Sequence, residues 1–294
     1  MTEVLQHVID AVSLGSLFAL VSLSVAIIFG VARLVNFANA EMMTIAGYVM
    51  VLTVRAPWPI VVLAAVGAAV AVSLLMNTIV FRWVRKAPPT SLLIISFGVS
   101  YFIQNALQIT QGSRAKTLDF GAELINTIPV GGVRVSALSL LSVGVTIVLV
   151  LGLTLLLQKT SIGRQVRAAS EDFVMTRLLG VRANRVIAYA FLLSGALAGI
   201  AGVLLTINTA TVTPSFGVAP LIVAFVAVVI GGIGSLSGAA IGGLLVGVIT
   251  VAFQVLLPVE LKPYRDVFVF ALVITILLVR PMGLMPPRFA KERV

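Results

Sequence analysis

Apolar stretches of about 20 residues recur along the whole chain, and they constrain its fold more than any other feature. A helix of about 20 apolar residues crosses the hydrocarbon core of a bilayer, whereas the strands of a membrane barrel are alternating segments of about ten residues. Only 10% of the 294 residues are charged, against about a quarter in soluble domains. The sequence therefore predicts an all-α polytopic membrane protein and excludes a soluble globular fold.

Nine segments are predicted to be membrane helices, and several of them are short. The predicted segments are 5–30, 38–54, 58–81, 90–110, 136–157, 184–207, 217–234, 239–257 and 265–280. Because of the short ones, we predict eight or nine crossings and expect 38–54 or the 217–257 pair to be broken or re-entrant. No stretch has the composition of a soluble domain, so residues 1–294 are treated as a single membrane domain.

The basic residues are concentrated in three parts of the chain. These are Arg82, Arg85 and Lys86; Lys159, Arg164, Arg167, Arg177, Arg182 and Arg185; and Arg280, Arg288, Lys291 and Arg293. Two predicted spans separate the first part from the second and four separate the second from the third, so all three lie on one side. By the positive-inside rule that side is the cytoplasm, which places the C-terminus inside and residues 111–135 outside. Loop charge, and not nucleic-acid binding, thus explains the net charge of +10.

Residue types that usually carry catalysis or metal binding are scarce. The chain has no cysteine, and its single histidine, His7, has no cluster around it and is expected to be an exposed terminal residue. Neither a G-x-x-x-x-G-K-[ST] phosphate loop nor an H-E-x-x-H motif occurs. We therefore expect no catalytic residues, no metal site and no bound cofactor. A cleavable signal peptide is not expected either, because Glu3 and Asp10 stand where a positive region would be required.

The segment 163–181, GRQVRAASEDFVMTRLLGV, has the signals of a short soluble helix. Ser170 is a predicted N-cap, Glu171 and Asp172 suit the first turn, and Gly180 suits the left-handed position after the last turn. A helix over 171–179 is predicted, with apolar contacts from Phe173, Leu178 and Leu179. Two interpretations stay open for this cytoplasmic loop, 158–183: an interfacial helix lying on the membrane, or a docking element for a soluble partner. If nucleotide energy drives this protein, the ATPase is a separate chain that docks here.

The segment 35–41, VNFANAE, places Asn36, Asn39 and Glu41 beside an apolar run. An ionisable residue at or within a span indicates a functional site, so the three residues are candidates for a substrate pathway. The alternative is local: Asn39 caps the next helix and Glu41 lies in its first turn. Both roles are compatible.

The segment 231–247, GGIGSLSGAAIGGLLVG, is the most glycine-rich. It is not a dinucleotide fingerprint, because Ser237 stands where the third glycine is required and the flanks are apolar spans. Glycines spaced four apart favour close helix packing, and residues 231–237 are predicted to form a tight hairpin or a helix break. The glycines assigned to packing or to the hairpin are Gly231, Gly232, Gly234, Gly238 and Gly242.

Four segments taken together resemble one family. They are VNFANAE (35–41), IGRQVRAASEDFVMTRLLGV (162–181), GGIGSLSGAAIGGLLVG (231–247) and YRDVFVFALVITILLVRPMGL (264–284), supported by SLGSLFAL (13–20) and QGSR (111–114). In this order they resemble the LivH-type permeases of bacterial branched-chain amino acid ABC importers. The resemblance covers most of the chain.

This resemblance implies the partners and the location. It implies a multi-pass protein of the bacterial inner membrane, in contact with lipid, that pairs with a second, LivM-like permease. Two cytoplasmic ATP-binding subunits would use the ATP, and a periplasmic or lipid-anchored binding protein would deliver the substrate. The loop that matches 162–181 would be the coupling segment, with Glu171, Asp172, Leu179 and Gly180 at its most recognisable positions.

One motif departs from the family pattern, which is commonly N-F-A-H-G-E where this chain has N-F-A-N-A-E. Related permeases carry urea, short amides or aromatic acids, so the substrate stays open among these and branched-chain amino acids. Two other classes are weighed: a stand-alone ion-coupled carrier or channel, which would need intramembrane charges as relays, and an intramembrane enzyme using Ser235 or Ser237, which would need a base near the serine.

Overall fold

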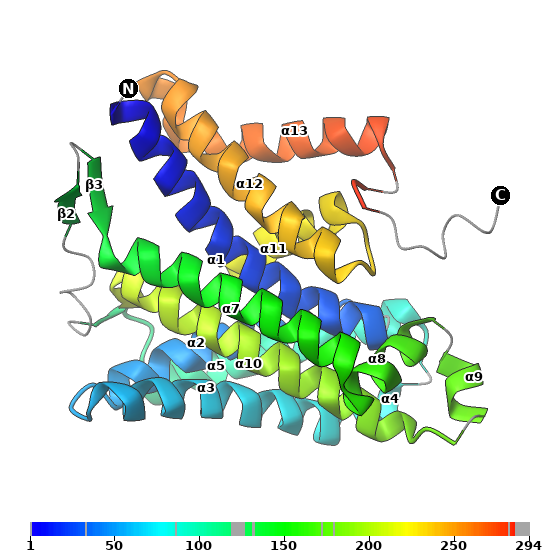
Figure 1. The fold of residues 1–294 in the computed structure, drawn as a ribbon. Helices are drawn as coiled ribbons and strands as arrows, with labels where there is room; N and C mark the ends of the chain where they lie inside the picture. Colours follow the sequence, from blue (N-terminus) through cyan, green and yellow to red (C-terminus); the bar gives the residue numbers. More distant parts are fainter. Residues whose placement is uncertain are drawn as a thin grey trace.

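The computed structural model describes residues 2–32, 34–85, 87–118, 127–130, 133–171, 173–178, 180–281 and 283–285. Most of them are helical (Figure 1). The α-helices are α1 (Thr2–Ala32), α2 (Asn39–Leu52), α3 (Trp58–Leu75), α4 (Arg82–Val84), α5 (Pro89–Gln111), α7 (Ala137–Lys159), α8 (Ser161–Glu171), α9 (Phe173–Leu178), α10 (Ala183–Thr209), α11 (Val218–Gly231), α12 (Leu236–Leu256) and α13 (Arg265–Val279). A π-helical turn, η1 (Met76–Phe81), joins α3 to α4, and a 3-10 helix, η2 (Val259–Tyr264), precedes α13.

Each of the nine apolar segments predicted from the sequence coincides with a helical segment. Six helical runs in the described residues are long and apolar enough to cross a membrane: Glu3–Ala32, Trp58–Val84, Pro89–Gln111, Ala137–Lys159, Asn184–Thr209 and Leu236–Leu256. The other three are α2, α11 and α13, with 14, 14 and 15 residues. The all-α, polytopic membrane class is confirmed.

Two pairs of long helices pack closely because glycines let their backbones approach. A Cβ added to Gly243 of α12 would lie 2.4 Å from the Cα of Ala19 in α1, and one on Gly247 would lie 2.2 Å from the Cα of Gly15. In the same way, Gly199 of α10 faces Ala69 of α3. Close backbone contact of this kind is a main source of helix association inside a membrane.

The helices α2 and α11 are too short to span alone. Fourteen residues extend for about 21 Å at 1.5 Å per residue, whereas the hydrocarbon core is about 30 Å thick. A non-helical stretch, 34–38, precedes α2, and in it Leu34, Asn36 and Ala38 are buried. The ring of Phe37 packs on Phe97 of α5, with ring centroids 3.8 Å apart. Such irregular backbone is tolerated at membrane depth only where protein surrounds it, so 38–54 is the broken segment expected from the sequence.

Four short strands lie at one end of the molecule, which also contains the N-terminus (Figure 1). β1 (Lys116–Thr117) pairs antiparallel with β4 (Thr211–Val212), and β2 (Thr127–Val130) pairs antiparallel with β3 (Val133–Ser136). The opposite end of the molecule contains α4, α8, α9 and the C-terminal end of α13. We call these the strand end and the basic end.

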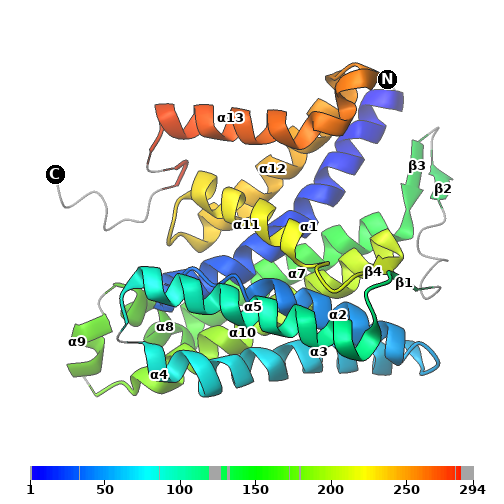
Figure 2. The same ribbon diagram turned by 180° about the vertical axis from the view of Figure 1, so that it is seen from behind.

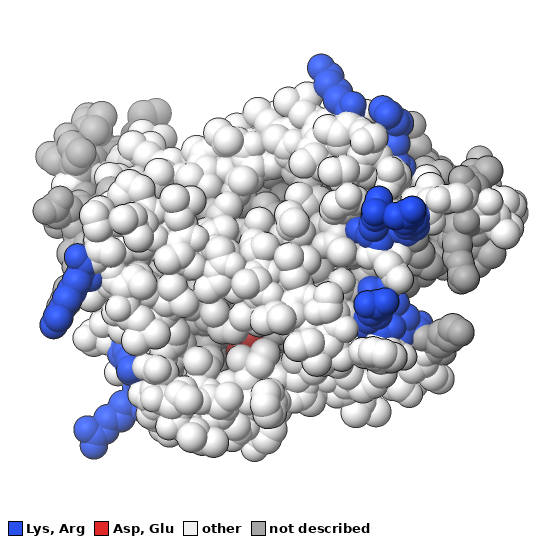
Figure 3. Space-filling model, turned by 90° about the horizontal axis from the view of Figure 1, so that it is seen from below, with Lys and Arg blue, Asp and Glu red and all other residues white. Residues whose placement is uncertain are grey.

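Charge separates these two ends. Figure 3 shows Lys and Arg side chains at both ends of the molecule with an almost uncharged middle. The described basic side chains on elements of the basic end are Arg82, Arg85, Lys159, Arg164, Arg167, Arg182, Arg185 and Arg280, and acids are lacking there among the described side chains. The strand end mixes both signs, with Arg55, Arg114, Lys116, Lys262 and Arg265 against Glu3, Asp10, Glu260 and Asp266. The described residues of the three basic parts therefore lie at the same end of the molecule.

Candidate functional site

A buried polar cluster surrounds the start of α2 in the middle of the bundle. Asn36, Asn39 and Glu41 are 3%, 1% and 0% exposed. Their partners come from the interiors of α1, α5 and α10, which places the cluster far from both ends. All three predicted pathway residues thus belong to one site, which we call the α2 cluster.

Asn39 connects three helices. Its side-chain nitrogen donates to Ser24 Oγ of α1 at 2.8 Å, and its oxygen accepts from Ser194 Oγ of α10 at 2.9 Å. The capping role considered for Asn39 is wrong: α2 begins at Asn39 itself, and the N-cap residue is Ala38, which has no side chain able to cap. The reason is tertiary, because two distant serines satisfy the amide in place of the local backbone.

Glu41 connects α2 to α5. Its Oε1 atom accepts from Ser100 Oγ at 2.6 Å and from Gln104 Nε2 at 2.8 Å. Its Oε2 atom is buried and has no hydrogen-bond partner within the described residues. A buried carboxyl group is costly unless its oxygens are paired or hydrogen-bonded, and this second oxygen is an unsatisfied polar atom inside the bundle.

The irregular turn before α2 is held by polar contacts from two sides. Asn36 Oδ1 accepts from the backbone N–H of Ala38 at 3.1 Å, and Ser96 Oγ of α5 accepts from the N–H of Phe37 at 3.2 Å. The Nδ2 group of Asn36 has no partner among the described residues. Asn36 and Glu41 therefore each retain one unused polar atom in this buried region.

The start of α11 meets the start of α2. The backbone N–H of Gly217 donates to Thr44 Oγ1 at 3.0 Å, and a Cβ at Gly217 would lie 2.0 Å from the carbonyl oxygen of Ala40. Two incomplete helices thus meet at mid-depth, an arrangement that transporters use to form solute and ion sites. Four partners of this cluster were not predicted from the sequence: Ser24, Ser100, Gln104 and Ser194. They lie between 15 and 155 positions from the residues they contact, and a single polar residue inside an apolar helix carries no pattern that points to such a partner.

At the basic end, α8 begins at Ser161, nine residues before the predicted N-cap Ser170. Thr160 Oγ1 accepts from the N–H of Gly163 at 3.0 Å and caps α8, whereas Ser170 lies inside α8 and its hydroxyl donates to the carbonyl of Arg167. The single helix predicted over 171–179 is therefore wrong; α8 ends at Glu171, and a separate α9 covers Phe173–Leu178. The physical reason is packing, since Val166 and Ala169 are buried on the inner face of α8.

The helix α8 is fixed to the bundle, whereas α9 presents apolar side chains to the outside. A Cβ on Gly163 would lie 2.4 Å from the Leu156 carbonyl oxygen, so α8 folds directly against the end of α7. On α9, Met175 and Leu178 are 55% and 75% exposed, and only Thr176 is buried among its described side chains. Gly180 has φ +85°, the left-handed conformation predicted for it. Asp172 and Leu179 lie outside the described residues, as do the side chains of Glu171 and Phe173.

Arg85 joins two of the basic segments. Its guanidinium donates to Asn184 Oδ1 of α10 at 2.5 Å and to Asn77 Oδ1 of η1 at 2.6 Å. Burial and the neighbouring Arg82 lower the pKa of Arg85, although an arginine stays charged at neutral pH. Arg85 therefore links the end of the α3–η1–α4 run to the start of α10.

The glycine-rich segment forms a helical hairpin. Gly231 ends α11, Gly232 and Gly234 have φ +110° and +90° in the turn, and α12 starts after Ser235, whose hydroxyl accepts from the N–H of Gly238. A Cβ on Gly242 would lie 2.0 Å from the Ala227 carbonyl oxygen. Gly231, Gly238 and Gly242 thus lie where α11 and α12 touch, while Gly232 and Gly234 form the turn.

Comparison with known proteins places the chain in one family. The family model described as "Branched-chain amino acid transport system / permease component" matches residues 8–277. The high-affinity branched-chain amino acid transport system permease protein BraD of Pseudomonas aeruginosa is 35% identical, and LivH of Escherichia coli is 34% identical; each alignment covers 96% of this chain and 95% of the relative. The ribose import permease protein RbsC of Haemophilus influenzae is 31% identical over 41% of this chain. No solved structure matches. This multi-pass membrane protein belongs to the permease component family of the branched-chain amino acid transport systems.

Proposed function

We propose that this chain is the permease subunit of a bacterial ABC importer for branched-chain or related small amino acids. Family membership and the names of the full-length relatives support this assignment. The observation that carries it is the α8–α9 segment: a helix fixed to the bundle, followed by a short helix with exposed Met175 and Leu178, at the basic end. Such a segment suits the transfer of force from a separate ATPase.

The charge distribution supports an orientation. The basic end, with α8, α9 and the end of α13, is assigned to the cytoplasm by the positive-inside rule. The strand end then faces the outside of the cell, and the C-terminus lies inside. The segment 170–180, which includes Ser170, Glu171, Asp172 and Leu179, is assigned to ATPase docking.

The same assignment defines the partners. Two ATP-binding subunits dock at the basic end and use the ATP. A second, LivM-like permease completes the membrane unit. A periplasmic or lipid-anchored binding protein delivers the substrate at the strand end. The sequence has no phosphate loop of its own, which fits a chain that leaves hydrolysis to its partners.

The mechanism we propose is alternating access. ATP-driven closure of the ATPase pair moves α9 and α8, and α8 transmits this movement to α7 through its close contact at Gly163. The attached helices then change which end of the bundle is open. Such a transition needs two packed states that the partner biases.

The α2 cluster is the proposed substrate pathway. Figure 2 shows α5 on the outside of the bundle beside α2, and Ile94, Tyr101, Phe102 and Ile109 on α5 are all more than two-thirds exposed. Near the middle of the bundle, hydrogen bonds to Glu41 and to the turn before α2 hold α5 against α2. Movement of α5 would expose Asn36, Asn39 and Glu41, and the unused polar atoms of Asn36 and Glu41 would then meet a solute.

The test is reconstitution of the complete importer in proteoliposomes with its binding protein. We expect uptake of labelled leucine that requires ATP and both ATPase subunits, and little uptake of labelled urea. Uptake by this chain alone, without ATPases, would assign it to the stand-alone carriers instead.

A further inference from the structure

A cavity of about 640 Å³ opens between helices at the strand end, far from α8 and α9. Its wall combines the first part of α1, the start of α7, the last turns of α10 and α12, and η2. This size falls within the range of about 300–1,000 Å³ typical of small-molecule sites. None of the residues assigned above to coupling, to the α2 cluster or to the glycine hairpin lines it.

The rim of this cavity carries charges of both signs on separate elements. Asp10 projects from α1 and Lys262 from η2, and neither forms an ion pair within the described residues. Asp10 Oδ1 accepts from Gln6 Nε2 at 3.0 Å, and its second oxygen accepts no hydrogen bond within the described part of the chain. His7, expected from the sequence to be an exposed terminal residue, is half-buried in the same wall.

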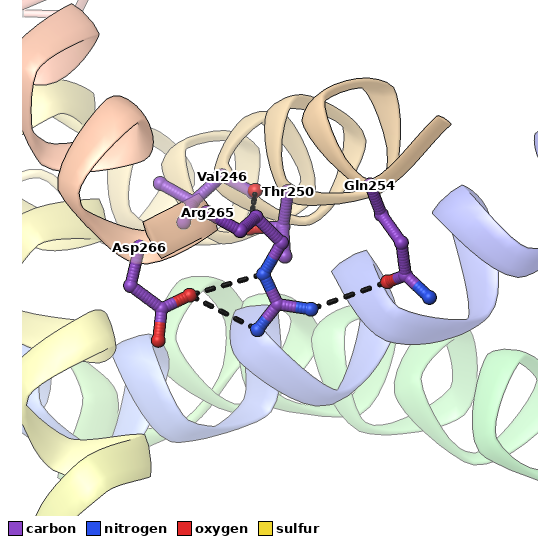
Figure 4. Close-up of polar contacts among 5 residues, drawn as sticks. All are labelled: Val246, Thr250, Gln254, Arg265 and Asp266. Atoms are coloured by element: carbon purple, nitrogen blue, oxygen red, sulfur yellow. Dashed lines mark hydrogen bonds and ion pairs between the residues drawn. The ribbon is translucent and has the colours of Figure 1, made fainter. Parts of the chain in front are cut away.

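Gln254 is a third polar group on the rim, and Arg265 holds its side chain in a fixed orientation. The guanidinium of Arg265 donates twice to Asp266 Oδ1, at 3.0 Å each, and once to Gln254 Oε1 at 3.2 Å. Figure 4 shows the amide oxygen of Gln254 turned toward Arg265 and its nitrogen turned away. Because Arg265 occupies the oxygen, the side chain of Gln254 offers the cavity a hydrogen-bond donor.

The floor of the cavity is aliphatic. Leu17 and Val251, which line it, are 3% and 8% exposed. The cavity is therefore amphipathic, with a carboxylate, an ammonium and an amide donor on its rim and buried aliphatic side chains on its floor. Burying aliphatic surface on such a floor is favourable, at about 25 cal/mol per Å².

We propose that this cavity is a receiving site for zwitterionic α-amino acids with aliphatic side chains. The substrate ammonium pairs with Asp10, its carboxylate pairs with Lys262 and the Gln254 amide, and its side chain contacts Leu17 and Val251. The inference rests on the proposed function, which places this end outside the cell, and it narrows the substrate class. Urea and short amides carry neither charge, so they would form no ion pair with Asp10 or Lys262.

The test uses the complete importer in proteoliposomes and two competitors that each lack one charge of leucine. Leucinamide lacks the carboxylate, and 4-methylpentanoate lacks the ammonium. The variants are Asp10→Asn and Lys262→Gln, with Glu3→Gln on α1 and Glu260→Gln on η2 as controls, since both control acids are exposed and lie outside the cavity wall. The measurements are the KM for leucine uptake and the inhibition by each competitor.

We expect each cavity variant to raise the KM for leucine about tenfold, as the loss of one charge-assisted hydrogen bond would. Asp10→Asn should abolish the preference for leucine over 4-methylpentanoate, and Lys262→Gln should abolish the preference over leucinamide. Cavity variants that match Glu3→Gln and Glu260→Gln in both measurements would overturn the inference. Absence of ATP-dependent leucine uptake in the unmodified importer would instead overturn the proposed function.

Discussion

The α2 cluster and the α8–α9 segment are both short polar stretches between apolar helices, yet the fold treats them in opposite ways. Asn39 and Glu41 are buried and hydrogen-bonded to three other helices. On α9, Leu178 is apolar but 75% exposed. Burial makes the α2 cluster part of the packing of the bundle, whereas exposure leaves α9 available to a partner. Substitutions in the first should therefore affect stability and function together, and those in the second should affect function alone.

The largest effect is expected where the two incomplete helices meet. Gly217→Val places side-chain atoms against the carbonyl oxygen of Ala40, only 2.0 Å from the Cβ position, and should destabilise the fold by about 3 kcal/mol through overpacking. The measurement is thermal unfolding of the detergent-purified protein. Gly67→Val on α3 is the control, because a Cβ there meets nothing within 4 Å. Equal shifts for the two variants would contradict the close contact.

Substitutions of Glu41 should show most clearly the combined effect on stability and on transport. Glu41→Ala removes the acceptor of Ser100 and Gln104, and each buried group left unpaired costs about 1–3 kcal/mol. Glu41→Gln keeps one oxygen for these donors, so its unfolding temperature should be close to that of the unmodified protein. Its transport rate should nevertheless be at least about tenfold lower. Uptake and unfolding measured on both variants separate the two roles. A Glu41→Gln importer with normal uptake would limit Glu41 to holding α5.

For the exposed segment we expect loss of coupling with no loss of stability. Leu178→Asp puts a charge on a side chain that is 75% exposed, so the free energy of unfolding should change by less than about 0.5 kcal/mol. Substrate-stimulated ATP hydrolysis and co-purification of the ATPase should fall about tenfold if Leu178 is a contact hot spot. Ser161→Asp, at the start of α8, is the matched control, since an acid is favourable in a first turn. Normal ATPase binding by Leu178→Asp would remove α9 from the interface.

The smallest effect is expected at Arg85, which lies at the basic end outside both regions. Arg85→Gln removes the contacts to Asn184 and Asn77, but the side chain is only half-buried, and polar contacts near a surface contribute little. ATP-driven uptake should fall about twofold with co-purification of the ATPase unchanged. Arg82→Gln, on the neighbouring exposed position, should leave uptake unchanged. A tenfold loss in Arg85→Gln would show that this link transmits the coupling movement.

The sequence by itself determined the helical membrane class, the nine apolar segments and the separation of charge. These follow from hydropathy and from the loop positions of Lys and Arg, both of which are local properties of the chain. The left-handed Gly180 and the glycine hairpin at 231–238 are local too, because backbone conformation there depends on the missing side chain.

Only the tertiary structure decided how the polar residues pair. Asn39 meets Ser194, 155 positions away, and this contact overrides the capping role that its local sequence favours. The start of α8 was likewise decided by packing, since burial of Val166 and Ala169 against the bundle extends that helix back to Ser161. The physical reason is the same in both cases: a side chain buried in the helix bundle is satisfied by whichever helix lies beside it, and the chain order does not reveal that neighbour.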